Sequence, residues 1–206
     1  MILSPMTLSE VKPIIVLGAG GHAKVLVSIL KRLDRKIIGV TDRFPDLKAD
    51  VLGVSIIGDD REIIEFKPDQ IDLVNGVGMT KPGQSARHQL AKKMRSLGFN
   101  FIQVIDPSAF IAPEAILEDG VQVMATAVIQ PGVIIRRDSI INSGAQVDHD
   151  SVVGEGSHLC PSSVLAGSVQ VGKMTMIGTG SVIIPEVVVG DSQMVKAGMV
   201  VTKSML

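Results

Sequence analysis

The sequence predicts an α/β domain followed by a parallel β-helix, with the change between them halfway along the chain. Two observations lead to this prediction. The first half alternates short apolar runs with amphipathic segments of helical period, whereas the second half repeats every six residues. We expect one domain over residues 1–103 and a second over residues 104–206.

The elements of the first half are those of a small, Rossmann-like parallel sheet, because short apolar strands alternate with helices. Strands are predicted at residues 14–17, 36–40, 54–57, 71–77 and 99–104, and helices at residues 25–33, 60–66 and 84–97. The last helix is amphipathic, and we expect its Arg87 and Lys92 on the solvent-exposed face.

A glycine-rich turn follows the first strand, with glycine at positions 18, 20 and 21. Backbone N–H groups in such a turn bind phosphate, helped by the N-terminus of the next helix. We therefore predict ligand-binding roles for Gly18, Gly20, Gly21 and the adjacent His22. Asp42, at the end of the second strand, is expected to accept a hydrogen bond from a ribose or base. The alternative for the glycines is a tight turn that binds no ligand, and the alternative for Asp42 is a simple turn at the end of the strand.

The size of the N-terminal half indicates which kind of nucleotide ligand it can bind. About 100 residues make only half of a full dinucleotide-binding fold, which favours a mononucleotide-linked ligand over the dinucleotide of a nicotinamide oxidoreductase. The glycine spacing matches two of the three fingerprint positions and has an alanine at the third, so by itself it remains a weak signal.

The second half repeats with a period of six. Every sixth residue is Leu, Ile or Val in an unbroken series of seventeen, which excludes chance. The residue four positions later is small, except at Gln193 and Met199. Three hexads, about 18 residues, make one three-sided coil with both rows inside. The aliphatic row is Ile105, Ile111, Leu117, Val123, Ile129, Ile135, Ile141, Val147, Val153, Leu159, Leu165, Val171, Ile177, Ile183, Val189, Val195 and Val201. Glycines expected at turns, with positive φ, are Gly154, Gly172, Gly178 and Gly190.

Composition excludes several classes of function. The formal net charge of −1 gives no electrostatic reason to bind nucleic acid or an anionic membrane, and the chain has no Trp or Tyr for base stacking. No export signal or membrane span is evident in the sequence. The one cysteine, Cys160, follows an inward aliphatic residue and is expected to be structural, which fits a cytoplasmic location.

One stretch of the repeat carries residues suited to catalysis. His149 and Asp150 lie between the inward positions Val147 and Ser151, so they are expected on an outward turn. A carboxylate beside an imidazole fixes its tautomer and stabilises the cation formed on proton abstraction. The pair is therefore a candidate general base, although an exposed histidine between acids is also typical of a solvated turn.

Several motifs together resemble one family. The segments are IVLGAGGHAK at residues 15–24, VIDPSA at 104–109, IIN at 140–142, VDHD at 147–150 and LAGSVQVG at 165–172. With them, the chain resembles the left-handed β-helix acyltransferases of the sialic acid O-acetyltransferase and bacterial nucleotide-sugar N-acetyltransferase family. The resemblance covers nearly the whole chain, but relatives commonly continue into a Gly-x-Pro-Ala-Lys segment where this sequence has residues 202–206.

The resemblance implies a left-handed β-helix, a homotrimer, acetyl-CoA between neighbouring β-helices and a sugar nucleotide held by the N-terminal domain. It implies that His149 is the general base, oriented by Asp150, and that Asn142 lies near the acceptor. His158 and Gly178 are implied as contacts to acetyl-CoA, with His158 also facing the acetyl carbonyl. Read without the resemblance, Asn142 is equally a turn residue and His158 a surface residue.

We therefore expect an acetyl-CoA-dependent N-acetyltransferase that acts on the 4-amino group of a nucleotide-linked 4-amino-4,6-dideoxy sugar for surface glycans. Transfer is expected to be direct, without a covalent enzyme intermediate. Sialic acid O-acetylation is the alternative within the same reaction class, and a non-catalytic sugar-binding or assembly module is the alternative outside it. No metal is expected, because the repeat contains only His149 and His158 as histidine ligands.

Overall fold

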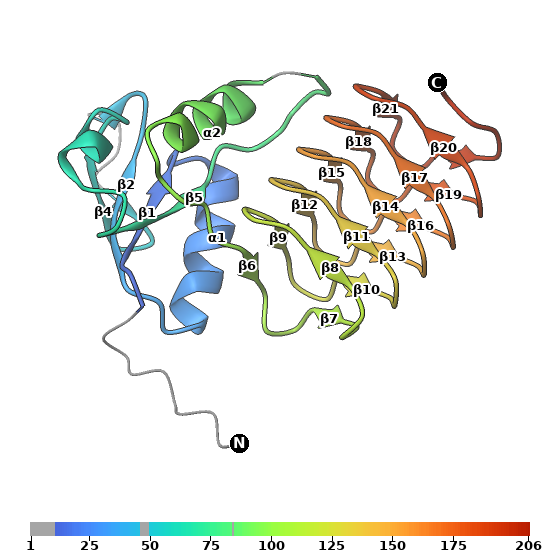
Figure 1. Ribbon diagram of the computed structural model, residues 1–206, viewed down its shortest axis with the longest axis horizontal. Helices are drawn as coiled ribbons and strands as arrows, with labels where there is room; N and C mark the ends of the chain where they lie inside the picture. The colour runs from blue at the N-terminus through green and yellow to red at the C-terminus, as the bar shows by residue number, and fades with distance from the viewer. Residues whose placement is uncertain (1–10, 46–49, 84) are drawn as a thin grey trace, which may run out of the picture.

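The computed structural model describes residues 11–45, 50–83 and 85–206. Residues 1–10, on which part of the expectation about export rests, and Gln84, the predicted start of a helix, lie outside this range. The α/β part and a long solenoid sit side by side along the molecule (Figure 1). Among the described residues, no helix is both long and apolar enough to cross a membrane.

A five-stranded sheet forms the α/β part. Its strands are β1 (Ile14–Leu17), β2 (Ile37–Thr41), β3 (Asp50–Val51), β4 (Val54–Gly58) and β5 (Asp72–Asn75), in the order β3-β4-β2-β1-β5. The sheet is not wholly parallel as predicted, because β3 runs antiparallel to β4. This strand has only two residues, which is too short to show the alternating pattern by which a strand is predicted from sequence.

Two helices cover the sheet, α1 (Gly21–Arg32) and α2 (Ala86–Ser96). Alternate residues of β1 point to opposite faces of the sheet. Ile14 and Val16 pack with α1 on one face, while Ile15 and Leu17 pack with residues of α2 on the other. The α1 cluster also includes Val104, Met124 and Ile140 of the solenoid, so α1 lies between the sheet and the solenoid.

Two predicted elements differ in the structure. The helix expected over residues 60–66 is a single 3₁₀ turn, η3 (Glu62–Glu65). The strand expected over residues 99–104 is wrong: Phe101 makes one isolated bridge to Leu73, and Val104 already belongs to the solenoid. The apolar residues there are buried in two different cores as the chain passes between them, which imitates the apolar run of a strand although the pairing is limited to that bridge.

The second half is a parallel β-solenoid. Each two-residue strand pairs with the strand one coil later, as in Val104 with Gln122 and Ile105 with Val123, which confirms the coil length of 18 residues. The strands form three sheets, in the orders β22-β19-β16-β13-β10-β7, β20-β17-β14-β11-β8 and β21-β18-β15-β12-β9-β6. They are β6 (Val104–Ile105), β7 (Phe110–Ile111), β8 (Ile116–Leu117), β9 (Gln122–Val123), β10 (Val128–Ile129), β11 (Ile134–Ile135), β12 (Ile140–Ile141), β13 (Gln146–Val147), β14 (Val152–Val153), β15 (His158–Leu159), β16 (Val164–Leu165), β17 (Gln170–Val171), β18 (Met176–Ile177), β19 (Val182–Ile183), β20 (Val188–Val189), β21 (Met194–Val195) and β22 (Val200–Val201).

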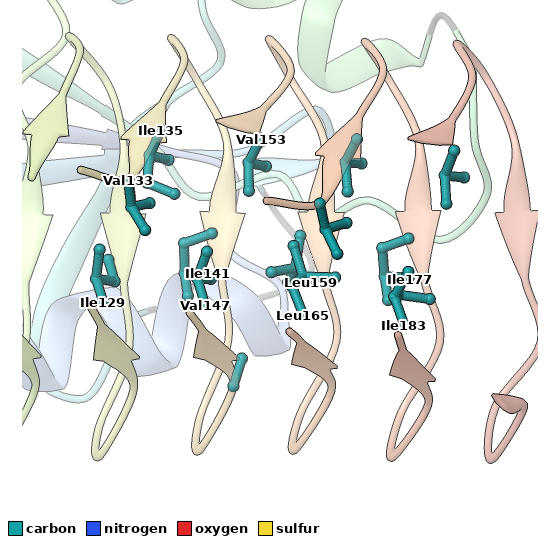
Figure 2. Close-up of a cluster of buried hydrophobic side chains, with 14 of the residues drawn as sticks. Ile129, Val133, Ile135, Ile141, Val147, Val153, Leu159, Leu165, Ile177 and Ile183 are labelled. Atoms are coloured by element: carbon teal, nitrogen blue, oxygen red, sulfur yellow. The ribbon is translucent and has the colours of Figure 1, made fainter. Parts of the chain in front are cut away.

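The aliphatic row fills the interior, as predicted, and Figure 2 shows these side chains between the coils. The small row is buried beside it where it contains serine, and its hydroxyls donate to backbone carbonyls. Ser139 donates to the Gly154 carbonyl at 2.9 Å, and Ser157 to the Gly172 carbonyl at 2.7 Å. These bonds satisfy the polar atoms inside an otherwise apolar prism.

The prediction of positive φ at Gly154, Gly172, Gly178 and Gly190 is wrong. Positive φ occurs instead two positions further along the hexads between residues 120 and 198, at Gly120, Thr126, Gly132, Asp138, Gly144, Asp150, Gly156, Ser162, Ser168, Met174, Gly180, Glu186, Ser192 and Gly198. At Gly154 the reason for glycine is close stacking, because a Cβ there would lie 2.5 Å from the carbonyl carbon of Gly172 in the next coil.

Residues near position 205 cover the last coil. The Gly190 N–H donates to the Met205 carbonyl at 2.6 Å, the Met205 N–H donates to the Val188 carbonyl at 2.9 Å, and the Val188 N–H donates to Ser204 Oγ at 3.1 Å. These bonds pair the edge of β20 that would otherwise remain open.

Candidate active site

A cavity of about 950 Å³ lies between the glycine-rich turn and the solenoid sheet that contains β12 and β15. It brings together residues predicted in both halves of the chain. These are Gly18, Gly20, Gly21, His22, Asp42, Asn142 and His158. The segment after β5 passes over the same sheet and reaches Met174, whose carbonyl accepts from the Gly83 N–H at 2.9 Å (Figure 1).

The glycine-rich turn exposes its backbone to the cavity. Gly18 has a φ of +89°, and a Cβ there would lie 3.0 Å from Val77 Cγ2, so both conformation and packing require glycine. A Cβ at Gly20 or Gly21 would have no atom within 4 Å. Because α1 begins at Gly21, these open positions lie at a helix N-terminus, where an anion is stabilised.

The Asp42 carboxylate holds the turn in place. Its Oδ2 accepts from the Ala19 N–H at 2.8 Å, and its Oδ1 accepts from the Phe44 N–H at 2.9 Å. Each carboxylate oxygen can accept a second bond, so this supporting role is compatible with the predicted contact to a ribose or base. That contact stays a prediction.

His22 is largely buried at the start of α1. Its Nε2 is 2.7 Å from Oε1 of Gln122, the outward-facing residue of β9. Burial and the nearby Arg87 cation lower the pKa of His22 to about 4, against the effect of the Gln122 hydrogen bond. The imidazole is therefore neutral at physiological pH.

His158 is buried against the segment after β5, with 8% of its surface exposed, so the alternative of a surface residue is wrong. Its Nδ1 donates to the Met79 carbonyl at 3.3 Å, and its Nε2 accepts from Asn142 Nδ2 at 3.1 Å. Burial lowers the pKa of His158 to about 4. The Asn142 Oδ1 accepts from the Ser143 N–H at 2.8 Å, which fixes the direction of the amide.

Arg87 departs from the prediction of an exposed helix position. It is 1% exposed, and its guanidinium donates to the carbonyls of Asn75 and Val77, both at 2.8 Å, and of Asp138 at 3.3 Å. Burial lowers the pKa of Arg87 to about 10. Lys92 is exposed as expected. The helical period alone did not reveal Arg87, because the face of α2 that carries it is covered by the solenoid.

His149 and Asp150 form an exposed pair on a corner of the solenoid, as predicted. Their side chains are 58% and 68% exposed, and His149 Nδ1 lies 2.9 Å from Asp150 Oδ2. The hydrogen bond that His149 donates to Asp150, followed by the charge of Asp148, raises the pKa of His149. The imidazole lies over Gly167 of the next coil, where a Cβ would come within 2.6 Å of Nε2.

This corner and the cavity lie on different sides of the solenoid. The corner joins β13 to β14 and so connects two of the three sheets, whereas Asn142 directly follows β12 and His158 belongs to β15, both strands of the third sheet. In a three-sided prism, a corner is opposite the face that it does not touch. One chain therefore does not bring His149 to the cavity.

Gly178 lies apart from both places. It is buried below the next coil, and a Cβ there would be 2.5 Å from the Ala197 nitrogen. Its predicted contact to acetyl-CoA stays a prediction. Cys160 is also buried, and burial raises the pKa of its thiol to about 11, so it is not a nucleophile at neutral pH. Within residues 11–45, 50–83 and 85–206, no cluster of three His, Cys, Asp or Glu forms a metal site.

Sequence reasoning missed the buried residues beneath the cavity, Asn75, Arg87 and Gln122. Asn75 donates from Nδ2 to the Arg87 carbonyl at 3.0 Å, and Gln122 donates from Nε2 to the Asn75 carbonyl at 2.8 Å. The one available signal was a polar residue at the outward hexad position, and that signal is shared by Gln146 and Gln170 on the other sheets.

Comparison with known proteins gives one family match and several structural matches. Residues 13–94 match the family described as the PglD N-terminal domain. Perosamine N-acetyltransferase from Caulobacter crescentus, as a histidine-to-asparagine mutant in complex with CoA and GDP-perosamine, is 35% identical with a TM-score of 0.88; the match covers 95% of this chain and 90% of that one.

The acetyltransferase domain of PglB from Neisseria gonorrhoeae, in complex with acetyl coenzyme A, is 30% identical with a TM-score of 0.86. That match covers 94% of this chain and 92% of the other. WeeI from Acinetobacter baumannii shares the fold, at 19% identity and a TM-score of 0.68. Comparison with curated protein sequences finds no match.

Proposed function

Because the chain belongs to the family of hexapeptide-repeat nucleotide-sugar N-acetyltransferases, we propose that it acetylates the 4-amino group of a nucleotide-linked 4-amino-4,6-dideoxy sugar. The enzyme depends on acetyl-CoA. The observation that carries the proposal is the cavity, where a glycine turn suited to phosphate meets Asn142 and His158 of the solenoid. In this proposal the nucleotide binds at the glycine turn, and the acceptor sugar lies beside it near Asn142 and His158.

His149 is the proposed general base. It removes a proton from the attacking amine while the nitrogen bonds to the thioester carbonyl carbon, and the C–S bond then breaks to release CoA. Asp150 holds the imidazole in one tautomer and stabilises the imidazolium, which raises the pKa of His149. Transfer is direct, because the one cysteine is buried and its thiol pKa is raised.

The oxyanion of the tetrahedral intermediate needs a hydrogen-bond donor. His158 was expected to provide one, but both of its ring nitrogens are engaged, with the Met79 carbonyl and with Asn142. Asn142 Nδ2 has two hydrogens and uses one for His158, so the second is suited to the acceptor or the oxyanion. A backbone N–H of the solenoid is the other proposed donor.

A homotrimer completes the site in this proposal. His149 and the cavity lie on different sides of one solenoid, so the base must reach the cavity of a neighbouring copy. Exposed apolar residues on the outward row of β7, β8 and β22, namely Phe110, Ile116 and Val200, provide a surface for packing solenoids together. Acetyl-CoA is proposed to bind in the groove between neighbouring solenoids.

The reaction is tested by incubating the protein with acetyl-CoA and a panel of UDP-, GDP- and dTDP-linked 4-amino sugars plus free sialic acid. We expect one amino sugar to gain one acetyl group by mass spectrometry, with release of thiol. Acetylation of sialic acid alone would instead establish an O-acetyltransferase. If acetyl-CoA neither binds nor reacts, the chain is a non-catalytic module.

The shared site is tested with two inactive variants, His149→Ala and Asn142→Ala. Each removes a different half of the proposed site, so mixed trimers contain some sites with both halves intact. We expect activity to return when the two are co-expressed, and sedimentation to give the mass of three chains. Mixed trimers that form but remain inactive would contradict the shared site.

A further inference from the structure

A row of buried hydrogen bonds runs from Arg87 through Asn75 and Gln122 to His22. The row begins at the Arg87 guanidinium, which must be the donor in each of its hydrogen bonds, because a guanidinium accepts none. Arg87 Nη1 donates to the Asn75 carbonyl at 2.8 Å, and that carbonyl also accepts from Gln122 Nε2 at 2.8 Å. All three residues are buried, with exposures of 1% or 2%.

The Asn75 carbonyl fixes the orientation of the Gln122 amide. A carbonyl cannot donate, so Gln122 must present its NH₂ group to Asn75, and rotating the amide by half a turn would place two oxygens face to face. Its Oε1 therefore faces His22, at 2.7 Å from Nε2. An amide oxygen only accepts, so His22 Nε2 carries the hydrogen.

We propose that Gln122 positions His22 as an imidazole protonated on Nε2, so that Nδ1 presents a hydrogen-bond acceptor to the cavity and receives an O–H or N–H hydrogen of the sugar nucleotide. The identity of that ligand rests on the proposed function. His22 lines the cavity, and within the described ranges no residue forms a hydrogen bond with its Nδ1. Gln122 is thus a positioning residue for substrate recognition.

This assignment changes the role expected of His22 beside the phosphates. A phosphate oxygen accepts hydrogen bonds, and a neutral imidazole with its hydrogen already given to Gln122 has none to offer. The backbone N–H groups at the start of α1 remain the phosphate donors. His22 instead matches a hydroxyl of the ribose or sugar, or an amino hydrogen.

The charges around His22 keep the imidazole neutral. Arg87 is the nearby cation, and His158 is the other titratable group that acts on His22. Protonation of Nδ1 would add a second buried positive charge near Arg87, and the lowered pKa of His22, about 4, agrees with this. His158 has the opposite tautomer, with Nδ1 donating to Met79, and both its nitrogens are engaged.

The tautomer is measured directly by ¹⁵N NMR of the imidazoles in the unmodified, uniformly labelled protein without ligand. The chain has four histidines, so the His22 signals are assigned from their loss in His22→Gln. We expect Nε2 with the shift of a protonated nitrogen and Nδ1 with that of an unprotonated one, unchanged from pH 5.5 to 8. A protonated Nδ1, or an even mixture of tautomers, would overturn the proposal.

Gln122→Met tests the positioning role, because methionine keeps the length of the side chain and removes the amide. The matched control is Gln170→Met, the same change at the same hexad position on another sheet. We expect tautomer mixing and a KM for the sugar nucleotide about threefold to tenfold higher in Gln122→Met, the effect of losing one neutral hydrogen bond. An unchanged tautomer in a folded Gln122→Met would overturn it.

Two substitutions of His22 separate its two nitrogens. Asparagine can place an amide oxygen near the position of Nδ1, whereas glutamine reaches instead toward Gln122. We expect His22→Asn to bind the sugar nucleotide more tightly than His22→Gln, and equal binding would contradict an acceptor role. The NMR result needs no substrate, so a confirmed tautomer with no acetylation would refute the proposed function and leave this inference intact.

Discussion

At the corner of the solenoid, the His149 imidazole is exposed and bonded to a carboxylate, whereas in the cavity His22 and His158 are buried near the Arg87 cation. The same side chain is therefore shifted in opposite directions. The pKa of His149 is raised by Asp150 and Asp148, while burial lowers the pKa of each cavity histidine to about 4.

In the proposed site, this difference separates proton transfer from recognition. A general base must gain a proton during the reaction, which an adjacent carboxylate favours. A residue that orients a ligand works best with a fixed pattern of donors and acceptors, and a buried neutral imidazole provides one. The two halves of the proposed site thus place different demands on histidine, and the fold meets them at a corner of the solenoid and in the cavity beside the opposite sheet.

Removing the base should have the largest effect. We expect His149→Ala to lower kcat by roughly 10²- to 10⁴-fold, the loss typical of a general base, with the trimer intact. Because the glycine turn and Asn142 hold the sugar nucleotide in this proposal, its binding measured by calorimetry should change much less than kcat. An active His149→Ala enzyme would show that the corner is not the source of the base.

Removing the charge of Asp150 should have the next largest effect. Asparagine accepts the positive φ of +60° at this position, so the turn is retained. We expect kcat to fall by about 10- to 100-fold, the value of a hydrogen bond to a charged group. The reaction needs neutral His149, and losing the carboxylate lowers its pKa, so the acid limb of the kcat profile should move to lower pH.

Asp148→Asn is the matched control for that shift. Asp148 raises the pKa of His149 less than Asp150 does, and its contact is to the His149 backbone N–H at 2.7 Å, which asparagine can keep. We expect a smaller displacement of the acid limb in the same direction. If Asp148→Asn moved the limb further than Asp150→Asn, the assignment of Asp150 as the orienting carboxylate would be wrong.

Displacing the His149 ring without removing it should have a moderate effect. A Cβ at Gly167 would lie 2.6 Å from His149 Nε2, whereas Ala125 and Ala197 occupy the same hexad position elsewhere, so the backbone accepts alanine. We expect Gly167→Ala to lower kcat by about tenfold through misplacement of the base, with KM for the sugar nucleotide unchanged. Wild-type kcat would show that the ring is free to move away.

The two regions also differ in how far the sequence reveals them. The row of aliphatic residues at every sixth position predicted the solenoid, because each coil must fill the same interior space. The outward placement of His149 followed from its position in the hexad, two residues after the inward Val147. The positive-φ row was missed although six of its members are glycines, because Thr126, Met174 and Glu186 interrupt the row and carry no mark of that conformation. Conformation there is imposed by the stacked coils, which overrides the preference of the individual residue.

In the cavity, the sequence predicted the glycine turn, Asn142 and His158. It did not predict the buried hydrogen bonds of Asn75, Arg87 and Gln122 beneath them. The bond from Gln122 to Asn75 spans 47 positions and that from Asn75 to Arg87 spans 12. Such contacts depend on how α2, β5 and the solenoid pack, and no local pattern encodes them. The same packing buried Arg87 on a helix face that its period marked as exposed.

Adding one methyl group to the glycine turn should have the smallest effect and should act mainly on binding. Gly20, the N-cap of α1, has a φ of −82°, and a Cβ there would meet no atom within 4 Å, so Gly20→Ala should lower stability only by the ~0.5 kcal/mol that separates glycine from alanine at an N-cap. If a phosphate approaches this backbone, we expect KM for the sugar nucleotide to rise by about threefold to tenfold with kcat unchanged.

Gly18→Ala separates this binding effect from loss of structure. At Gly18 the positive φ of +89° and the contact of 3.0 Å with Val77 Cγ2 should lower stability by about 1 kcal/mol or more, measured by denaturant unfolding. A rise in KM with the smaller loss of stability in Gly20→Ala, beside the larger loss of stability in Gly18→Ala, would assign the first position to the ligand and the second to the fold. An unchanged KM in Gly20→Ala would move the phosphates away from the start of α1, and the cavity would then need another anion donor.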